Sequence, residues 1–533
     1  MIHWIQQSCL EKVTVDFDRF KKPYDHAVAL IGEEIAYQIV LYNDKGSSEP
    51  FTVEDRSDLP VHLHLVKQVP ITWPYRQNAD GGEYLLDKPG ILPDCLVPIK
   101  SGEQIMIGPN LTVLWVCAQA PIAHKCHYRI RFFSENEEVC SDFTCEVLDH
   151  ELSRPSMKIF EHIYPTSVAL DHHVPLFSDV HWSLLERYFA MAAKHGVTDL
   201  LTPIFPVSYP SIGVHEAVQL VQIEKEKSRY HFHYDLFDCW VLLARKQGIH
   251  RFVFPPLFPH IKTHQALPFV AYNSYRNEPL FEDIDCFDPQ YRVFITAFLR
   301  SLAKHLREMN LDCQVSFQLT DGVSEEHLET YIACKMMVYD LIQKFNIMDP
   351  VSNLGLYRRN LFASPIIPLG KLYQFLEEPT LYSIGYFDPS GYSPVADLLI
   401  AGSSARLRSL GLLSYKYNIT ALFNRGFNYS NSAGAAQHAL NLDGGNAYPS
   451  GAMSLVYPGQ EGPLPSIRLK LLQYALQDLR ALEALEMYLS HEQILAMIRR
   501  ECPVEMDKAN TNAEKLLAFR EKVNRLLIQY SKK

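Results

Sequence analysis

The chain has 533 residues, about three times the length of a typical domain, which predicts two or three domains and excludes a peptide hormone or mini-protein. Apolar residues make up 47% and charged residues 21%, so large cores can form and disorder by composition is excluded. Fifty basic against sixty-one acidic residues give a net charge of −11, and because no long basic run occurs, nucleic acid is not an expected partner.

The first residues and the cysteines indicate the cellular compartment that we expect for the protein. The start has no basic region followed by an apolar one, and no stretch of about 18 apolar residues occurs, so we expect a soluble cytoplasmic protein without a membrane partner. Eleven cysteines are scattered without a C-x-x-C pair or a zinc spacing. They indicate reduced thiols and no metal site.

Residues 1–150 are predicted to form a β-sandwich domain. Apolar residues alternate with polar ones in short runs of roughly even spacing, which is typical of strands buried on one face. These runs are IAYQIVLY at 35–42, VHLHL at 61–65, LTVLWV at 111–116 and HYRIRFF at 127–133.

From residue 151, helical runs alternate with strand-like ones, and two helices are predicted to end at the glycines Gly196 and Gly248. Eight strand candidates predict a (β/α)₈ barrel over 151–485, with a doubly wound sheet as the alternative. The absence of glycine-rich phosphate loops disfavours nucleotide binding, and no cofactor is expected. Residues 486–533 are predicted to form a helical extension. The strand candidates are KIFEHIY, DLLTPIF, RFVFPPL, QVSFQLT, SNLGLY, LYSIGYF, ITALFN and MSLVYP.

A barrel collects its functional residues at the C-terminal ends of its strands. The side chains expected there follow the fourth, sixth, seventh and eighth strand candidates, and they are Asp321, Tyr386, the group Asn424, Arg425 and Asn428, and Tyr457. No His-Glu dipeptide is followed by the second histidine of a zinc protease, and His260 and His264 lack a third ligand. We therefore expect no metal.

At Asp321 the sequence resembles a known family. The segment QVSFQLTDGVSEEHLETY resembles the fourth-strand segment of glycoside hydrolase family 123 and of the uncharacterised bacterial family around it. The segments at 181–205, 403–429 and 444–482 also resemble that family, and so does the N-terminal sandwich, over about residues 30–485. The resemblance implies the same fold, a sandwich followed by a barrel.

The resemblance also implies hydrolysis of β-linked N-acetylhexosamine, typically N-acetylgalactosamine, with the substrate's own acetamide as nucleophile. An Asp-Glu pair serves this reaction, the first carboxylate orienting the acetamide and the second protonating the leaving oxygen. Asp321 matches the first and is the predicted catalytic residue. Gly322 stands at the second position, and Glu325 and Glu326 align with the following helix, where we expect them to face solvent.

A second departure concerns Arg425, which lies in Asn-Arg-Gly-Phe-Asn where the family usually has tryptophan. If it faces inward, an anionic or differently decorated ligand is favoured. We predict substrate-binding roles for Tyr386, Asn424, Arg425, Asn428 and Tyr457, and structural roles for Arg406 and Arg468.

Three hypotheses stay open for the function. The chain is a glycoside hydrolase-like protein with a replacement acid, a non-catalytic descendant that binds sugar or a partner, or a barrel of unrelated activity such as a lyase or isomerase. The sequence leaves open whether it is an active enzyme, which sugar and linkage it takes, and its oligomeric state.

Overall fold

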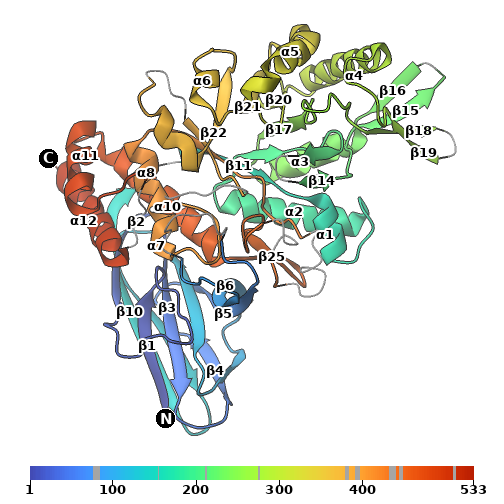
Figure 1. Ribbon diagram of the computed structural model, residues 1–533. Helices are drawn as coiled ribbons and strands as arrows, with labels where there is room; N and C mark the ends of the chain where they lie inside the picture. Colours follow the sequence, from blue (N-terminus) through green and yellow to red (C-terminus); the bar gives the residue numbers. More distant parts are fainter. Residues whose placement is uncertain are drawn as a thin grey trace.

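The computed structural model describes residues 1–75, 84–153, 155–210, 213–227, 229–273, 276–378, 383–389, 396–430, 440–442, 448–507 and 512–532. The β-rich N-terminal part lies below the barrel in Figure 1, and helices α7 and α10 lie where the two parts meet. Helices α11 and α12 run along one side of this junction.

The N-terminal part consists of two five-stranded sheets that face each other. All strand pairs are antiparallel except β2 with β10, which is parallel. The first sheet has the order β1 (Ile2–Ser8), β3 (Glu34–Asn43), β8 (Thr112–Gln119), β5 (Val61–Ile71) and β6 (Gly90–Ile99). The second has the order β2 (His26–Ile31), β10 (Glu138–Glu151), β9 (Lys125–Phe133), β4 (Glu49–Asp55) and β7 (Gln104–Ile107).

The sandwich core follows from the alternation of side chains along its strands. In β9, Tyr128, Ile130 and Phe132 are buried between the sheets, as the sequence pattern predicts. The ring of Tyr37 from the first sheet stacks on that of Phe143 from the second, with centroids 4.0 Å apart. The predicted sandwich is confirmed.

Eight parallel strands then close into a barrel, as predicted. In order around it they are β11 (Lys158–His162), β12 (Asp199–Leu201), β17 (Arg251–Pro256), β20 (Val315–Gln318), β21 (Asn346–Pro350), β22 (Ser364–Pro368), β23 (Ser383–Tyr386) and β24 (Ile419–Phe423).

Two of the eight predicted strands are wrong. The run SNLGLY contains the short helix α6 (Leu354–Tyr357), because the side chain of Asn353 caps it by accepting a hydrogen bond from the N–H of Leu356. The run MSLVYP contains β25 (Val456–Gly459), which pairs only with β26 (Gly462–Pro465), outside the barrel. The true fifth and sixth strands, β21 and β22, are five residues long and contain proline, which hides a strand pattern.

Helices connect the barrel strands and cover the barrel. Gly196 and Gly248 adopt positive φ angles of 94° and 90° just beyond α2 and α3, as the predicted helix ends require. The longer helices are α1 (Pro165–Asp171), α2 (Asp179–Lys194), α3 (Asp235–Lys246), α4 (Pro289–Glu308), α5 (Leu328–Ile342), α8 (Leu410–Lys416), α10 (Ile467–Leu485), α11 (His491–Glu501) and α12 (Ala513–Ser531).

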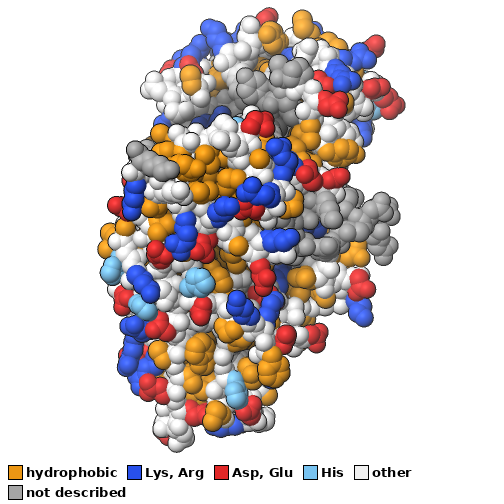
Figure 2. Space-filling model, turned by 90° about the vertical axis from the view of Figure 1, so that its left-hand side faces the viewer, with side chains coloured by type: hydrophobic (Ala, Val, Ile, Leu, Met, Phe, Trp, Pro, Cys, Tyr) orange, Lys and Arg blue, Asp and Glu red, His pale blue; other side chains and the backbone are white. Residues whose placement is uncertain are grey.

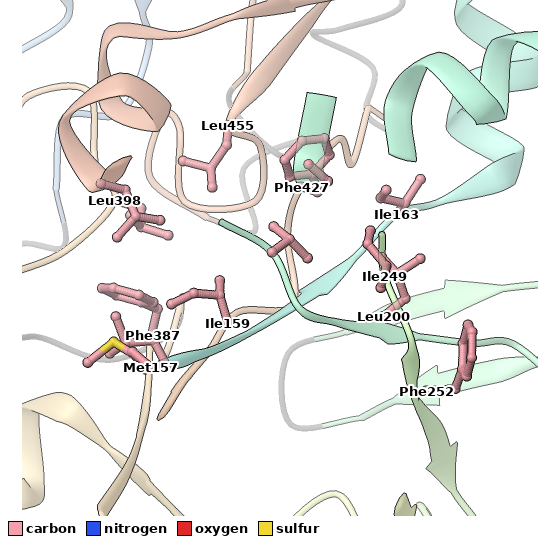
Figure 3. Packing of buried hydrophobic residues seen from close by; sticks show 14 of the residues in the cluster. Met157, Ile159, Ile163, Leu200, Ile249, Phe252, Phe387, Leu398, Phe427 and Leu455 are labelled. Carbon is pink, nitrogen blue, oxygen red and sulfur yellow. The ribbon is translucent and has the colours of Figure 1, made fainter. Parts of the chain in front are cut away.

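Strand alternation divides the barrel residues between two cores. Ile159, Leu200 and Phe252, from three adjacent strands, belong to the large cluster outside the barrel, part of which Figure 3 shows. Their neighbours Phe160 and Leu201 belong to the smaller cluster inside it. This alternation fixes which polar side chains can reach the barrel interior.

Buried ion pairs join the sandwich to the barrel. Arg468, in the first turn of α10, donates to both carboxylate oxygens of Asp94 in β6 and to the carbonyls of Leu398 and Gly451. Lys470 pairs with Glu34 in β3 at 2.8 Å. These contacts place Arg468 in the structural role that the sequence predicted.

Within the described ranges, no helix has both the length and the apolar character needed to cross a bilayer. Figure 2 shows the side that carries the C-terminal helices, where Lys and Arg side chains lie among Asp and Glu. The division of the chain at residues 150 and 485 stays a prediction.

We predict that Arg468→Met lowers the free energy of unfolding by about 3–5 kcal/mol, because it leaves Asp94 buried without its cation. Urea denaturation measures the loss. The control is Arg499→Met, whose ion pair with Glu492 is exposed and 3.8 Å long and should contribute less than about 1 kcal/mol. Equal effects of the two substitutions would contradict the structural role of Arg468.

Candidate functional site

The centre of the barrel mouth is an ion pair between Asp321 and Arg425. Asp321 follows β20 and Arg425 follows β24, so both lie at the C-terminal ends of barrel strands. Arg425 donates from Nη1 to Oδ1 of Asp321, and the two side chains are 1% and 4% exposed, respectively. The structure thus brings together the predicted catalytic residue and a predicted ligand-binding residue.

Two tyrosine rings lie next to the Arg425 guanidinium. Its central carbon lies 4.2 Å from the ring centre of Tyr209 and 5.1 Å from that of Tyr386. Tyr386 ends β23, and Tyr209 ends β13 (Val207–Tyr209), which forms a hairpin with β14 (Val214–Glu216) beyond the second barrel strand. Burial raises the pKa of both hydroxyls, so the rings are neutral and their faces attract the cation.

The side-chain amides of Asn424 and Asn428 form hydrogen bonds within the protein. Asn424 donates to Glu161 at 2.9 Å and to the carbonyl of Gly426. Asn428 accepts from the backbone N–H of Tyr164 at 2.8 Å and donates to the carbonyl of the same residue. Both side chains tie the end of β24 to β11 and the segment after it, and their predicted contacts with sugar stay a prediction.

Tyr457 lies elsewhere, in contrast to its predicted place beside Asp321. It belongs to β25, outside the barrel, and its fully buried hydroxyl donates to Asp94 of the sandwich at 2.6 Å. It packs in a cluster with residues of β5 and β6. MSLVYP contributes to the hairpin of β25 and β26 and not to the barrel, so Tyr457 does not follow a barrel strand. These contacts give Tyr457 a structural role.

Several buried polar atoms at this end of the barrel have no hydrogen-bond partner among the described residues. Side-chain alternation points His162 and Gln318 inward, since their neighbours Ile163 and Phe317 belong to the outer core. Each such atom costs about 1–3 kcal/mol unless water or a ligand meets it. The atoms are both ring nitrogens of His162, both amide atoms of Gln318, Oγ1 of Thr320, the hydroxyls of Tyr209 and Tyr386, and Nε of Arg425.

His162, Gln318 and Tyr209 are site residues that the sequence reasoning missed. Burial, and secondarily the charge of Arg425, lower the pKa of His162 to about 3, so its ring is neutral and offers one donor and one acceptor. His162 also stacks on Tyr164, with centroids 3.9 Å apart. A polar residue at an inward position near the end of a barrel strand is the signal that could have found His162 and Gln318.

The position after Asp321 carries no acid. Gly322 has a φ of 147°, and a side chain built on it would meet no heavy atom within 4 Å, apart from its chain neighbours. Glu325 and Glu326 lie in the short helix Glu325–His327 and are exposed, which confirms that they face solvent. Space for an acid therefore exists above Gly322, and, apart from the chain neighbours of Gly322, no carboxylate of the described residues lies within 4 Å of this position.

Three buried carboxyls lie around the site, and burial raises the pKa of each. Asp349, at about 6, accepts from the backbone N–H groups of Leu319 and Thr320 and so fixes the end of β20. Glu161, at about 8, accepts from Asn424. Glu216, at about 7, shares the hairpin with Tyr209 and contacts the hydroxyl of Thr166. Within the described residues, no three or more His, Cys, Asp or Glu side chains gather as a metal site would require.

Comparisons with known proteins point to one family. The model of the family described as glycoside hydrolase 123, catalytic domain, matches residues 163–485. A solved family 123 glycoside hydrolase from Clostridium perfringens, studied for glycolipid glycan hydrolysis, has a TM-score of 0.78 at 13% identity, covering 100% of this chain and 99% of that one. This likeness shows the fold.

A second solved structure, β-glucuronidase 2 from Bacteroides uniformis, is 10% identical and covers 86% of this chain and 48% of its own. Its TM-score is 0.31, which is too low to support a conclusion about this chain. No curated protein matches the chain.

We predict that Arg425→Met lowers the free energy of unfolding by about 3–5 kcal/mol, because Asp321 stays buried without its cation. Adding Asp321→Asn should recover most of this loss, since it removes the unpaired charge. Urea denaturation of both single variants and the double variant measures the coupling. Arg56→Met, at an exposed ion pair, is the control. Additive effects of the two substitutions would contradict the buried pair.

We predict that Glu161 makes stability depend on pH. Between its ordinary pKa of about 4.3 and the raised value of about 8, the folded chain holds a proton that the unfolded chain has lost, so stability falls as pH rises through this range. Glu161→Gln should reduce the fall between pH 5 and pH 8, measured by urea denaturation. Glu325→Gln, at an exposed carboxyl, should leave it unchanged, and an identical fall in wild type and Glu161→Gln would refute the assignment.

Proposed function

The chain belongs to glycoside hydrolase family 123, and from that membership we propose that it is a glycoside hydrolase-like, carbohydrate-active protein whose barrel mouth binds a sugar. One observation carries the proposal: buried donors and acceptors that have no partner among the described residues gather around the Asp321–Arg425 pair. A hydroxyl-rich ligand supplies both donors and acceptors, as these atoms require. Aromatic faces beside them, from Tyr209 and Tyr386, are typical of sugar sites.

The ion pair favours a neutral sugar over an acidic one. The sequence favours an anionic or differently decorated ligand if Arg425 faces inward. Arg425 does face inward, but Asp321 balances its charge. An additional anion would enter a buried space without a cation of its own, which is costly. N-acetylhexosamine, the sugar that the family resemblance implies, is neutral and meets this condition.

The same pair weakens the reaction that the family resemblance implies. In substrate-assisted hydrolysis, a carboxylate orients the acetamide and stabilises the positive charge that develops on it. We assign this role to Asp321, but Arg425 already donates to Oδ1 and brings a positive charge next to the developing one. We therefore expect Asp321 to position an acetamide better than it stabilises the transition state.

The leaving group receives no proton from Gly322. A positioned acid contributes about 10²- to 10⁴-fold to the rate when the leaving group needs protonation. Cleavage is therefore restricted to glycosides whose leaving group has a low pKa, unless another carboxyl supplies the proton. Glu216 is the replacement that we test, because burial raises its pKa to about 7 and its hairpin carries Tyr209.

The second candidate function is a non-catalytic, carbohydrate- or partner-binding descendant of the family. Two observations favour it, the missing acid at Gly322 and the occupied carboxylate of Asp321. Gly322→Glu is a poor test between the two functions, because the φ of 147° strains any residue with a side chain. Leaving-group dependence is the sharper test.

We predict that the protein binds N-acetylgalactosamine or N-acetylglucosamine, measured by calorimetry, and cleaves a dinitrophenyl N-acetylhexosaminide while leaving the corresponding methyl glycoside intact. Asp321→Asn should remove the cleavage, because an amide cannot balance the acetamide's charge. Glu216→Gln should leave the aryl substrate unaffected, since that leaving group needs no proton.

The outcomes separate the two functions. Binding without any cleavage would favour the non-catalytic descendant. Efficient cleavage of the methyl glycoside that Glu216→Gln abolishes would identify Glu216 as the acid. No binding of either sugar and no turnover would contradict the proposal of a carbohydrate site at this mouth.

A further inference from the structure

Apolar side chains gather at the surface in the segment that joins the first barrel strand to α2. Leu170, Leu176 and Val180 are 57%, 45% and 58% exposed, respectively. Phe177 and Trp182 are partly buried, and their rings stack with centroids 5.2 Å apart. We call these five residues the apolar rim. A single exposed apolar residue needs no explanation, but several in one short segment indicate a surface that contacts a partner or a ligand.

Helix α1 places this segment beside the barrel mouth, because it contacts both of the chain segments that carry site residues. Thr166 contacts Glu216 in the hairpin of β13 and β14. Ser430, in the segment after β24, donates to both carboxylate oxygens of Asp171 at 2.9 Å. Leu170 is four residues after Thr166, so the two side chains lie on the same face of α1. Leu170 therefore lies one helical turn from the contact with Glu216.

The connection between α1 and α2 is held in one conformation by a buried histidine. Nδ1 of His181 accepts from the backbone N–H of Phe177 at 2.9 Å, and Nε2 donates to the carbonyl of Pro165 at 3.0 Å. Burial lowers the pKa of His181, which keeps the ring neutral with one donor and one acceptor. His173 and Phe177 have positive φ angles of 52° and 58°, which residues other than glycine adopt only where the surroundings fix them. The apolar rim is thus a preformed surface.

The chemistry of the leaving group indicates which part of a substrate reaches this surface, and this step rests on the proposed function. Gly322 supplies no proton, so the glycosides that can be cleaved are those whose leaving group has a low pKa. Phenols combine a low pKa with an apolar aromatic ring, whereas sugars and aliphatic alcohols need the proton. When the sugar occupies the mouth, the group on its anomeric carbon extends toward the border of the mouth. An aromatic group there is stabilised by contact with apolar side chains.

We propose that the apolar rim binds the aromatic aglycone of the substrate, and that the substrates are aryl β-N-acetylhexosaminides. In the reaction, the bond between the anomeric carbon and the phenolic oxygen breaks, and its electron pair leaves with the phenolate. The phenolate takes a proton from water, and water supplies the new hydroxyl of the released sugar. One molecule of water is consumed for each sugar and phenol released.

The test titrates the full-length protein, by calorimetry, with methyl, phenyl and hexyl 1-thio-β-glycosides of N-acetylgalactosamine and of N-acetylglucosamine. Sulfur in place of the glycosidic oxygen prevents turnover during the titration. The phenyl compound should bind about tenfold more tightly than the methyl compound, because its ring buries apolar surface on the rim. It should also bind more tightly than the hexyl compound, since a flexible chain loses more conformational freedom on binding.

Two substitutions on the rim locate the contact. Leu170→Asn and Leu176→Asn should each lower the ratio of phenyl to methyl affinity about threefold, and the double variant should bring it close to one, because polar side chains replace the apolar contact. The methyl compound should bind to these variants as it does to wild type. Leu242→Asn, 61% exposed on α3, is the matched control and should keep the wild-type ratio. Circular dichroism and the Tm verify that each variant folds.

The outcomes distinguish failure of this proposal from failure of the proposed function. Equal affinities of wild type for the methyl and phenyl compounds would overturn the aglycone site and leave the sugar site intact. Tightest binding of the hexyl compound would assign the rim to an alkyl chain and overturn the aromatic aglycone. An unchanged ratio in the double variant would show that the rim residues are wrongly assigned. If none of the compounds binds, the sugar site itself is contradicted and the aglycone site with it.

Discussion

The barrel mouth depends on a single buried ion pair, that of Asp321 with Arg425. The two residues come from the fourth and eighth strands of the barrel, so their contact spans its interior. Such a pair persists only where other groups compensate for the loss of water. Tyr209 and Tyr386 do so by placing their ring faces against the guanidinium. The charge, the shape and the accessible chemistry of the site all follow from this arrangement.

The chain belongs to family 123 and has its fold. In the function that we propose, Asp321 takes the position of the first carboxylate that the family resemblance implies, Gly322 leaves the second position without an acid, and Arg425 engages Asp321. A fold can host several chemistries, because function depends on a few side chains at the strand ends. Under the proposed function, this site is better suited to binding than to proton transfer.

A second set of buried charges organises the contact between sandwich and barrel. Side chains of α10 and α12 reach carboxylates of β3, β6 and the turn before β3, so the C-terminal helices connect the two parts. Each pair is costly to bury and costlier to break, which makes the junction specific.

The sequence by itself determined the local structure and the order of the parts. Alternating residues such as Tyr128, Ile130 and Phe132 predicted the sandwich, and glycines 196 and 248 predicted the helix ends, because these signals act over a few neighbouring residues. The position of Asp321 at a strand end followed from the same reasoning. The two proline-containing strands β21 and β22 were not predicted, since a five-residue strand is too short to show a clear alternation.

Tertiary structure alone decided which side chains meet. The partner of Arg425 is 104 residues away, and the partner of Tyr457 is 363 residues away in the sandwich. His162, Tyr209 and Gln318 became site residues only when the barrel closed and brought separate strand ends to one space. No periodicity encodes such contacts, because closure of the barrel, and not local spacing, sets the distances between strands.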